Sequence, residues 1–335
     1  MDDPDRRPLS RPGCILPRRA TPRERAVAAG GGLRLPWRVK ALFRPEAIRT
    51  RTLALGLALA AALAGLAAAP AVRAQEACDA GQAGWSEAAA ANGASLSAMV
   101  WTPFDREEYG WLAYAPLVQH ELDTQCDPSS PAFAEKLAAF QVRFHLPPTG
   151  LFDAPTFQVF RGLWQERRPF VMARVADICP EPPPLRELGY LVAEEEHADR
   201  LTRLLRRDTL AAYRRMVAAA RAEVPEIAAD PELLQIFSGF RDPEADAARC
   251  ATERNCDGLR RAVCSPHRTG AAVDLYVGHI EGLGVDSTHP DSRRHMSQGA
   301  AYRWLVRNAG RFGFVPYVYE PWHWEYVGEG GAAAP

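Results

Sequence analysis

Residues that can bind a metal and move protons gather in two short segments near the C-terminus of this 335-residue chain. The first segment contains His267 and Asp274, and the second contains Glu320 and His323. Two imidazoles and one carboxylate are the ligand set of a catalytic zinc whose fourth position stays open for water. We therefore expect His267, Asp274 and His323 to hold Zn²⁺ and Glu320 to carry protons.

The first of these segments is predicted to be a loop that runs into a strand over residues 271–277. Alternation along that strand places Asp274 on the same face as Ala272, whose small side chain leaves room for a metal and a substrate. Gly270 is a flexible point at which the loop can fold so that His267 approaches Asp274, seven residues away.

The second segment is predicted to open the last strand, residues 322–327. Alternation places His323 and Glu325 on one face of this strand. Glu320 precedes a proline, which keeps Glu320 extended and positions it at the mouth of the strand, three residues from His323.

Helices and further strands must support these segments. We expect a helix that begins with Asp208 as its N-cap, a short apolar strand over 233–237, and a helix over 297–312 that ends at Gly313. A charged stretch with helical spacing, 188–207, is predicted to be a connecting helix.

A proline-rich run that begins after Cys179 cannot continue a helix or a central strand, and it separates two stretches with different patterns. We predict five segments from this and from composition. They are a basic leader with a signal peptide (1–74), a helical domain (75–180), a linker with the connecting helix (181–207), the zinc domain (208–328) and a flexible tail (329–335).

The leader is an expected export signal. An apolar run, 53–69, follows Arg49 and Arg51, and cleavage is expected after Ala74, although an uncleaved membrane anchor is the alternative. The long basic stretch before this run is compatible with an overcalled start codon. Residues 1–74 hold 14 Lys and Arg against 5 Asp and Glu, and the remainder holds 26 against 36. An acidic body without a basic stripe argues against nucleic-acid binding.

Six of the seven cysteines lie after the leader. In an oxidising compartment they are expected to form up to three disulfides, with fifteen possible pairings. A metal cluster formed by Cys250, Cys256 and Cys264 is the less favoured alternative, because the chain contains no Cys-x-x-Cys pair. We expect a disulfide to stiffen the loop that leads to His267.

The helical domain has an apolar helical face, a Pro147–Gly150 break, and Asp153 as the cap of a further helix with Phe157 and Phe160 inward. This domain contains a sequence motif in which Phe-Gln is followed by a Thr-Gly turn and an Asp-x-x-Thr helix start. The motif resembles the peptidoglycan-binding repeat over about 45 residues. That resemblance implies wall binding, whereas a purely structural role is the alternative.

The zinc domain resembles the zinc D-alanyl-D-alanine peptidases of the VanY and VanX type. The resemblance is carried by Ser-x-His-x-x-Gly-x-Ala-x-Asp from Ser265 and by Glu-x-Trp-His from Glu320. It extends through Ser-Gly-Phe-Arg, which ends at Arg241, and through the helix 304–309, and so covers about 120 residues in the family's order.

Carried over by motif position, the resemblance implies His267, Asp274 and His323 as zinc ligands and Glu320 as the catalytic acid and base. It also implies Arg241 as an anchor for the carboxylate of the substrate, with a structural salt bridge as the alternative role. Ser265 would hydrogen-bond the substrate.

The expected fold is α+β: a small antiparallel sheet with flanking helices carries the zinc site and follows a small all-α domain. The expected function is that of an exported zinc carboxypeptidase that hydrolyses the D-Ala-D-Ala bond of peptidoglycan stem peptides in the periplasm or cell wall. The alternatives are an endopeptidase that cuts within stems or cross-links and a non-catalytic wall-binding protein. The expected contact with a membrane is through the signal segment, if that segment is not cleaved.

Overall fold

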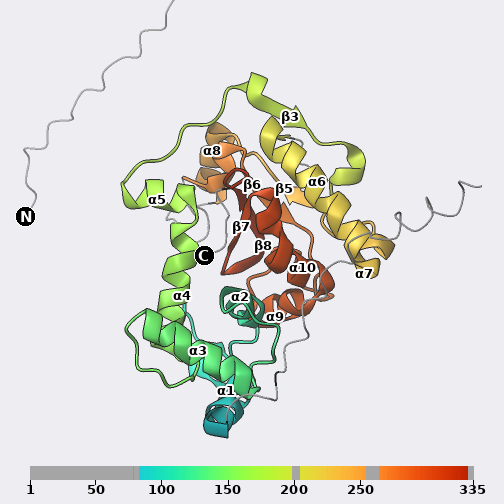
Figure 1. Cartoon of the computed structure of the whole chain (residues 1–335). Helices are drawn as coiled ribbons and strands as arrows, with labels where there is room; N and C mark the ends of the chain where they lie inside the picture. Colours follow the sequence, from blue (N-terminus) through green and yellow to red (C-terminus); the bar gives the residue numbers. More distant parts are fainter. Residues whose placement is uncertain (1–77, 79–82, 198–203, 254–263, 331–335) are drawn as a thin grey trace, which may run out of the picture. The chain divides into compact units, whose positions relative to one another are not determined.

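The computed structural model describes residues 78, 83–197, 204–253 and 264–330 (Figure 1). The predicted leader and signal peptide, and the tail beyond residue 330, lie outside the described residues, so those assignments stay predictions. Within the described part of the chain, no helix combines the length and the apolar character needed to cross a membrane.

A four-stranded antiparallel sheet forms the centre of the second half of the chain. Its order is β5 (Ile236–Ser238), β6 (Ala272–Leu275), β8 (Glu320–Tyr326) and β7 (Phe314–Tyr317). The predicted combination of a small antiparallel sheet with helices is thereby confirmed. All four residues of β6 are buried, as expected for an inner strand covered on both faces.

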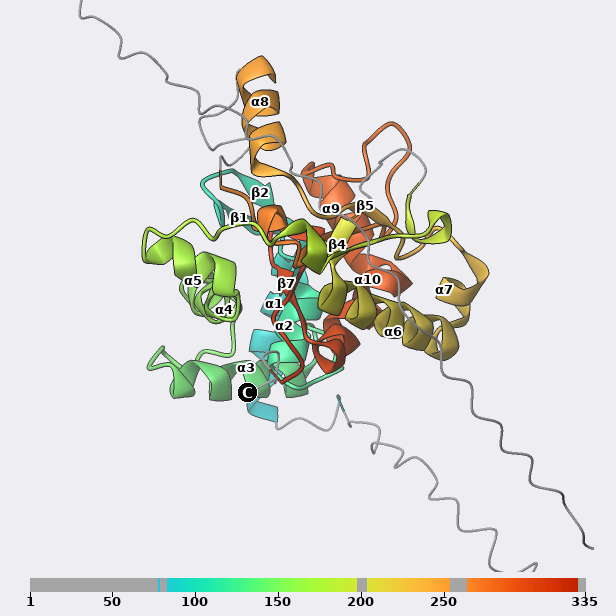
Figure 2. The ribbon, with the colours of Figure 1, turned by 90° about the horizontal axis from the view of Figure 1, so that it is seen from above.

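In Figures 1 and 2, α4 (Ala154–Glu166) lies on one side of this sheet, and α6 and α10 lie on the other. The helices of this half are α6 (Arg207–Glu223), α7 (Pro225–Ala229), α8 (Pro243–Glu253), α9 (Pro290–Gln298) and α10 (Ala300–Asn308). On α6 the buried stripe includes Leu210, Tyr213, Met216 and Ala220. The helix buries them because they recur every three to four residues on one face.

The first half of the described chain is mainly helical. Its helices are α1 (Ser86–Ala98), α2 (Ala115–Glu121), α3 (Pro131–Arg143), α4 (Ala154–Glu166) and α5 (Pro169–Val175). They surround buried aromatic side chains, among them Phe157 and Phe160, as predicted. Asp153 caps α4, because its side chain accepts a hydrogen bond of 2.9 Å from the amide of Thr156. Two short strands, β1 (Val100–Trp101) and β2 (Glu108–Tyr109), pair antiparallel here, so this half is not purely helical.

The prediction of a connecting helix over 188–207 was wrong. Strand β3 (Leu188–Tyr190) pairs antiparallel with β4 (Leu204–Arg206) instead. Strand β4 runs directly into α6, so the N-cap of that helix is Arg206 and the predicted cap, Asp208, lies in its first turn. Backbone pairing between two segments distant in sequence outweighed the helical spacing of the side chains.

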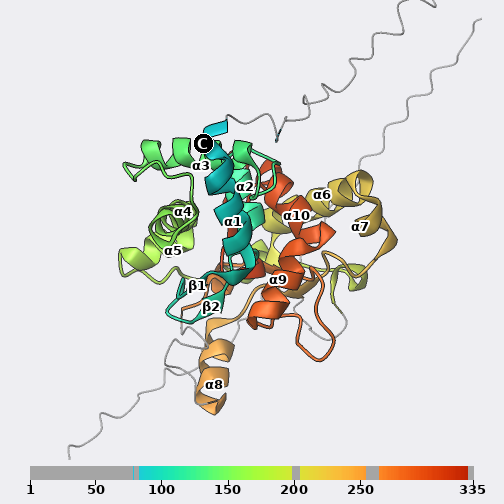
Figure 3. The same ribbon diagram turned by 90° about the horizontal axis from the view of Figure 1, so that it is seen from below.

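The predicted helix 297–312 is interrupted. Gly299 is extended, with ψ of 152°, and it separates α9 from α10. A short 3₁₀ turn, η5 (Ala309–Phe312), follows α10 and ends at Gly313 in the left-handed conformation, as predicted for a helix end. Figure 3 shows α9 and α10 as two separate ribbons.

Buried contacts join the two halves of the described chain. All the described residues fall within one compact unit. Arg293, which is 1% exposed, donates from Nη1 to the Oε1 of Glu108 at 2.6 Å and from Nη2 to the hydroxyl of Tyr114 at 2.7 Å. The helical half is therefore packed against the half that contains the sheet. The predicted domain boundary near residue 180 stays a prediction.

Candidate metal centre

Strand pairing brings two of the predicted ligands together. Asp274 lies in the inner strand β6, opposite Ser238 of β5 and opposite His323 of β8. The side chains of directly opposed residues in antiparallel strands lie on the same face of the sheet. Asp274 and His323 are both buried, although they are 49 residues apart in the sequence.

A short 3₁₀ turn, η4 (Pro266–Thr269), presents the third predicted ligand, His267. The Ser265 hydroxyl begins this turn by accepting a hydrogen bond of 3.3 Å from the amide of His267. Gly270 ends the turn with φ of +68°, a conformation that favours glycine. A Cβ at that position would also lie 3.0 Å from the Cγ of Arg206. The predicted fold of the loop around Gly270 is therefore confirmed.

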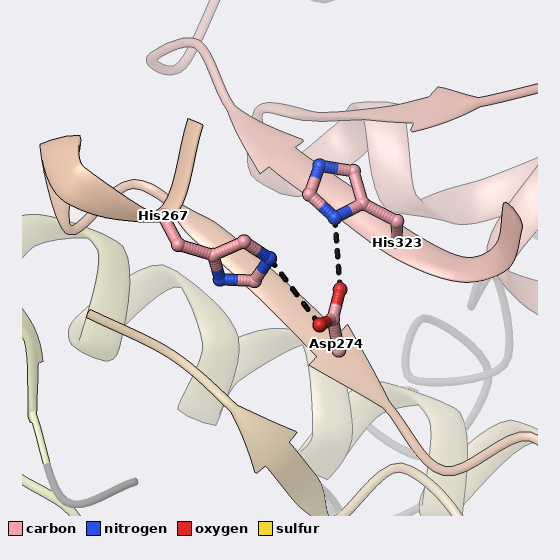
Figure 4. Close-up of side chains that lie close together, drawn as sticks. All are labelled: His267, Asp274 and His323. Atoms are coloured by element: carbon pink, nitrogen blue, oxygen red, sulfur yellow. Dashed lines mark hydrogen bonds and ion pairs between the residues drawn. The ribbon is translucent and has the colours of Figure 1, made fainter. Parts of the chain in front are cut away.

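The three side chains converge on one point, as Figure 4 shows. The Nε2 of His267 lies 3.2 Å from the Oδ2 of Asp274, and the Nδ1 of His323 lies 2.8 Å from its Oδ1. One potential ligand atom from each of the three residues lies within 4.8 Å of the others, and all three residues are buried. This spacing and this set of two nitrogens and one oxygen suit a single zinc ion.

The other ring nitrogen of each histidine faces an acceptor. The Nδ1 of His267 lies 2.7 Å from the carbonyl oxygen of Gly239, and the Nε2 of His323 lies 3.2 Å from the Oε1 of Glu325. Because a carbonyl or carboxylate oxygen accepts, each of these nitrogens is assigned the hydrogen. When both rings are neutral, the Nε2 of His267 and the Nδ1 of His323 carry the lone pairs and could bind a metal.

Burial and the neighbouring carboxylates act in opposite directions on the pKa values of the two histidines. Burial works against the charged form of His323, but hydrogen bonds from its ring to Asp274 and Glu325 outweigh burial and raise its pKa to about 9. Burial lowers the pKa of His267. Burial also works against ionised Asp274, but the adjacent histidines outweigh it and hold the pKa of Asp274 below its usual range. An ionised carboxylate at this point is ready to accept a cation.

Glu320 is the first residue of β8 and pairs with Tyr317 of β7. Its burial raises the pKa of the carboxyl group above the ordinary value, and the charges of His323 and Asp274 act on it. A raised pKa makes this carboxylate a better proton acceptor than an ordinary one, which suits a group that accepts and returns a proton.

Arg241 lies at the edge of the same group. Its Nη2 donates to the Oδ2 of Asp274 at 3.2 Å and to the Oγ of Ser238 at 2.8 Å, and its Nε donates to the same Oγ at 3.1 Å. The Arg241 side chain is 29% exposed, so part of the guanidinium faces solvent. Both roles considered from the sequence, a substrate anchor and a structural ion pair, are compatible with this position.

Two charged residues near His323, Glu325 and Arg168, were not predicted to belong to the site. Glu325 accepts from the Arg168 guanidinium, whose Nε lies 3.0 Å and whose Nη2 lies 2.5 Å from the Oε1 of Glu325. Glu325 could have been found, because it shares a strand face with His323. Arg168 could not, because it lies 157 residues from its partner.

Disulfides occur within the described chain, as predicted. They join Cys78 to Cys126 and Cys179 to Cys264, and Cys250 is also disulfide-bonded. The bond at Cys264 lies immediately before Ser265 and the His267 turn, which confirms the expected tether on this loop.

We expect the double variant Cys179→Ser/Cys264→Ser to lose about 3–5 kcal/mol of unfolding free energy, because the bond closes a loop of 85 residues. Urea unfolding of the oxidised wild type and the variant measures this difference. A double variant at Cys78 and Cys126 serves as the comparison, because that disulfide closes a shorter loop of 48 residues. An unfolding midpoint that equals that of the wild type would contradict the prediction.

Comparison with known proteins gives a match for the second half of the chain. Residues 202–329 match the family model VanY, described as D-alanyl-D-alanine carboxypeptidase, which confirms the predicted family for this domain. A search of curated proteins gave no match.

Two solved structures resemble part of the chain. The structure of the LdcB LD-carboxypeptidase shares 24% sequence identity with this chain, with a TM-score of 0.32. The match covers 46% of this chain and 72% of the LdcB chain. A variant of the vancomycin-resistance D,D-pentapeptidase VanY in complex with Zn(II) is 23% identical, covers 45% of this chain and 85% of its own, and has a TM-score of 0.27. These scores are low, so the assignment rests on the family match and on the chain's own residues.

Proposed function

We propose, from the D-alanyl-D-alanine carboxypeptidase domain at residues 202–329, that this protein is a zinc carboxypeptidase that acts on peptidoglycan stem peptides. The observation that carries the proposal is the convergence of His267, Asp274 and His323. Their ligand atoms lie within 4.8 Å of one another inside this domain. A structural zinc normally has four protein ligands, whereas three leave a position for the reaction.

The residues present fit zinc. His267 would contribute Nε2, His323 would contribute Nδ1, and Asp274 would contribute a carboxylate oxygen. When bound, the ion lowers the pKa of water and polarises the scissile carbonyl. Gly239 and Glu325 hold the two imidazole rings in the tautomers that this ligand set needs.

Glu320 would transfer the protons of the reaction. Its carboxylate accepts a proton from the attacking water and later donates that proton to the leaving amine of the terminal D-alanine. Burial raises its pKa, which makes the proton easier to hold between these two steps. Ser265 would hydrogen-bond the substrate, although its hydroxyl also accepts from the amide of His267.

Arg241 would bind the terminal carboxylate of the peptide. A guanidinium can donate two parallel hydrogen bonds to a carboxylate. The Arg241 side chain is 29% exposed, and its Nη2 lies 3.2 Å from the Oδ2 of Asp274. Selection of a free C-terminus is the property that separates a carboxypeptidase from an endopeptidase, so this residue bears directly on the choice between them.

Mass spectrometry of muropeptides tests the proposed bond. The full chain, loaded with zinc and mixed with purified peptidoglycan, is expected to release one terminal D-Ala from pentapeptide stems. Conversion of cross-linked dimers to monomers without that release would instead establish the endopeptidase. Binding to the wall with neither product would establish the non-catalytic wall-binding protein.

Export and wall binding belong to the same proposal. The disulfides suit an oxidising compartment such as the periplasm or the outside of the cell. Wall binding by the helical half rests on the resemblance of residues 137–157 to the peptidoglycan-binding repeat. A pull-down of the full chain with insoluble peptidoglycan, with and without a chelator, would separate wall binding from binding at the metal centre.

Replacement of Arg241 by Lys is expected to lower kcat/KM for a peptide ending in D-Ala-D-Ala by about 10–100-fold, because one charged two-point contact is lost. Steady-state kinetics on the peptide and on its C-terminal carboxamide measures the effect. The wild type should prefer the free carboxylate and the variant should lose most of that preference. An unchanged preference would leave Arg241 as a structural ion pair with Asp274.

A further inference from the structure

We propose that Arg168, from the helical half of the chain, is a positioning residue of the metal centre that acts on His323 through Glu325. The inference rests on the proposed zinc site. The carboxypeptidase domain spans residues 202–329, so Arg168 lies outside it. We infer that this outside residue helps to orient a metal ligand inside the domain.

The contacts form an unbroken chain from the helical half to the ligand. Arg168 lies between α4 and α5, and its Nε and Nη2 donate to the Oε1 of Glu325 at 3.0 Å and 2.5 Å. The same Oε1 lies 3.2 Å from the Nε2 of His323. The Nδ1 on the opposite side of that ring faces Asp274 at 2.8 Å. One carboxylate oxygen of Glu325 thus joins Arg168 to the proposed ligand.

Other contacts fix the Arg168 guanidinium on every side. Its Nη1 donates to the Oε1 of Gln165 at 2.6 Å, and its carbon lies 4.2 Å from the centre of the Tyr317 ring. The Tyr317 ring in turn lies edge to face with the His323 ring, with 5.9 Å between centres. Arg168 is 5% exposed and Glu325 is 4% exposed, so neither group has freedom to move into solvent.

This arrangement bears on the strength of metal binding. A carboxylate that accepts from the outer nitrogen of a ligating histidine fixes the orientation of the ring and its tautomer. Glu325 can hold one position only while its charge is paired, because an unpaired buried carboxylate is strongly destabilising. Arg168 supplies the pairing charge and two directed hydrogen bonds. The residue therefore stabilises the position of Glu325 and, through it, that of His323.

The adjacent arginine offers a matched control. Arg167 donates to Glu121 through Nη1 at 2.7 Å and Nη2 at 2.8 Å, and the Glu121 side chain is 1% exposed. Loss of Arg167 also leaves a buried carboxylate without its cation, but Glu121 belongs to α2 and forms no described contact with the three proposed ligands. The two variants thus differ in their link to the metal centre.

The test compares Arg168→Met with Arg167→Met in the full chain. The zinc dissociation constant is measured by competition with a chromophoric chelator at fixed pH. We expect Arg168→Met to bind zinc about 10–100-fold more weakly than the wild type and Arg167→Met to bind it within about twofold of the wild type. The visible absorption spectrum of the Co²⁺-loaded protein should change in the first variant alone.

The possible outcomes separate this inference from the function on which it rests. If the wild type binds no zinc, the proposed function fails. If the wild type binds zinc and Arg168→Met binds it equally well with an unchanged Co²⁺ spectrum, the positioning role of Arg168 is overturned. Equal losses in both arginine variants would also overturn it, because they would indicate a general effect of loosening the helical half.

A conservative variant makes the test independent of folding. Arg168→Lys keeps the positive charge but cannot reproduce the two donors that converge on Glu325. If Arg168→Met does not fold, the zinc affinity of Arg168→Lys tests the inference instead. A zinc dissociation constant at least about threefold above that of the wild type supports the inference. A dissociation constant equal to that of the wild type rejects it.

Discussion

Replacement of Glu320 by Gln is expected to lower kcat for D-Ala-D-Ala hydrolysis by about 10²–10⁴-fold while zinc stays bound. Glutamine keeps the size of the side chain and its place at the start of β8, but it cannot accept a proton from water. The attacking water then loses its base, and the leaving amine loses its acid. Release of D-alanine from a synthetic stem peptide measures the rate, and the zinc content of the variant is measured in parallel.

The design of this experiment separates loss of proton transfer from general damage. Glu281→Gln is the control, because Glu281 is exposed in the loop before α9 and lies outside the proposed site. That variant should retain the wild-type rate. Equal hydrolysis by Glu320→Gln and wild type would remove the catalytic role of Glu320. Absence of hydrolysis by zinc-loaded wild type would remove the proposed enzyme activity.

Replacement of His267 by Ala is expected to remove the metal together with the activity. With one of the three proposed ligands deleted, Asp274 and His323 remain, and two protein ligands are too few for a catalytic zinc site. Since the ion contributes several kcal/mol to stabilising the transition state, we expect the rate to fall by about 10³-fold or more. Metal analysis after desalting and the same D-alanine assay measure the two effects.

A histidine outside the centre provides the comparison for this variant. His279 is exposed and its ring lies 3.0 Å from the hydroxyl of Tyr276, so His279→Ala should keep both zinc and activity. Excess zinc should not restore the His267→Ala variant, whereas it should restore wild type that has been stripped with a chelator. A His267→Ala protein that retains one zinc per chain and wild-type turnover would show that the ion lies elsewhere.

Short-range patterns in the sequence were sufficient to predict the local features of the centre. Gly270 lies three residues after His267, and the structure places it at φ of +68°, where a side chain would be strained. The cap at Asp153 was predictable for the same reason, since a cap depends on contacts within four residues. The wrong predictions, the helix over 188–207 and the unbroken helix over 297–312, concern segments whose structure depends on distant partners or on a glycine break.

The residues of the proposed metal centre could be picked out along the chain, because His267, Asp274, Glu320 and His323 lie in motifs whose spacing and order are readable. What surrounds them depends on how the chain folds. Strand register set Asp274 opposite His323, and packing of the helical half brought Arg168 to Glu325 across 157 residues. No periodicity encodes such a pair, because burial and hydrogen bonding act between groups that are close in space, whatever their separation in the chain.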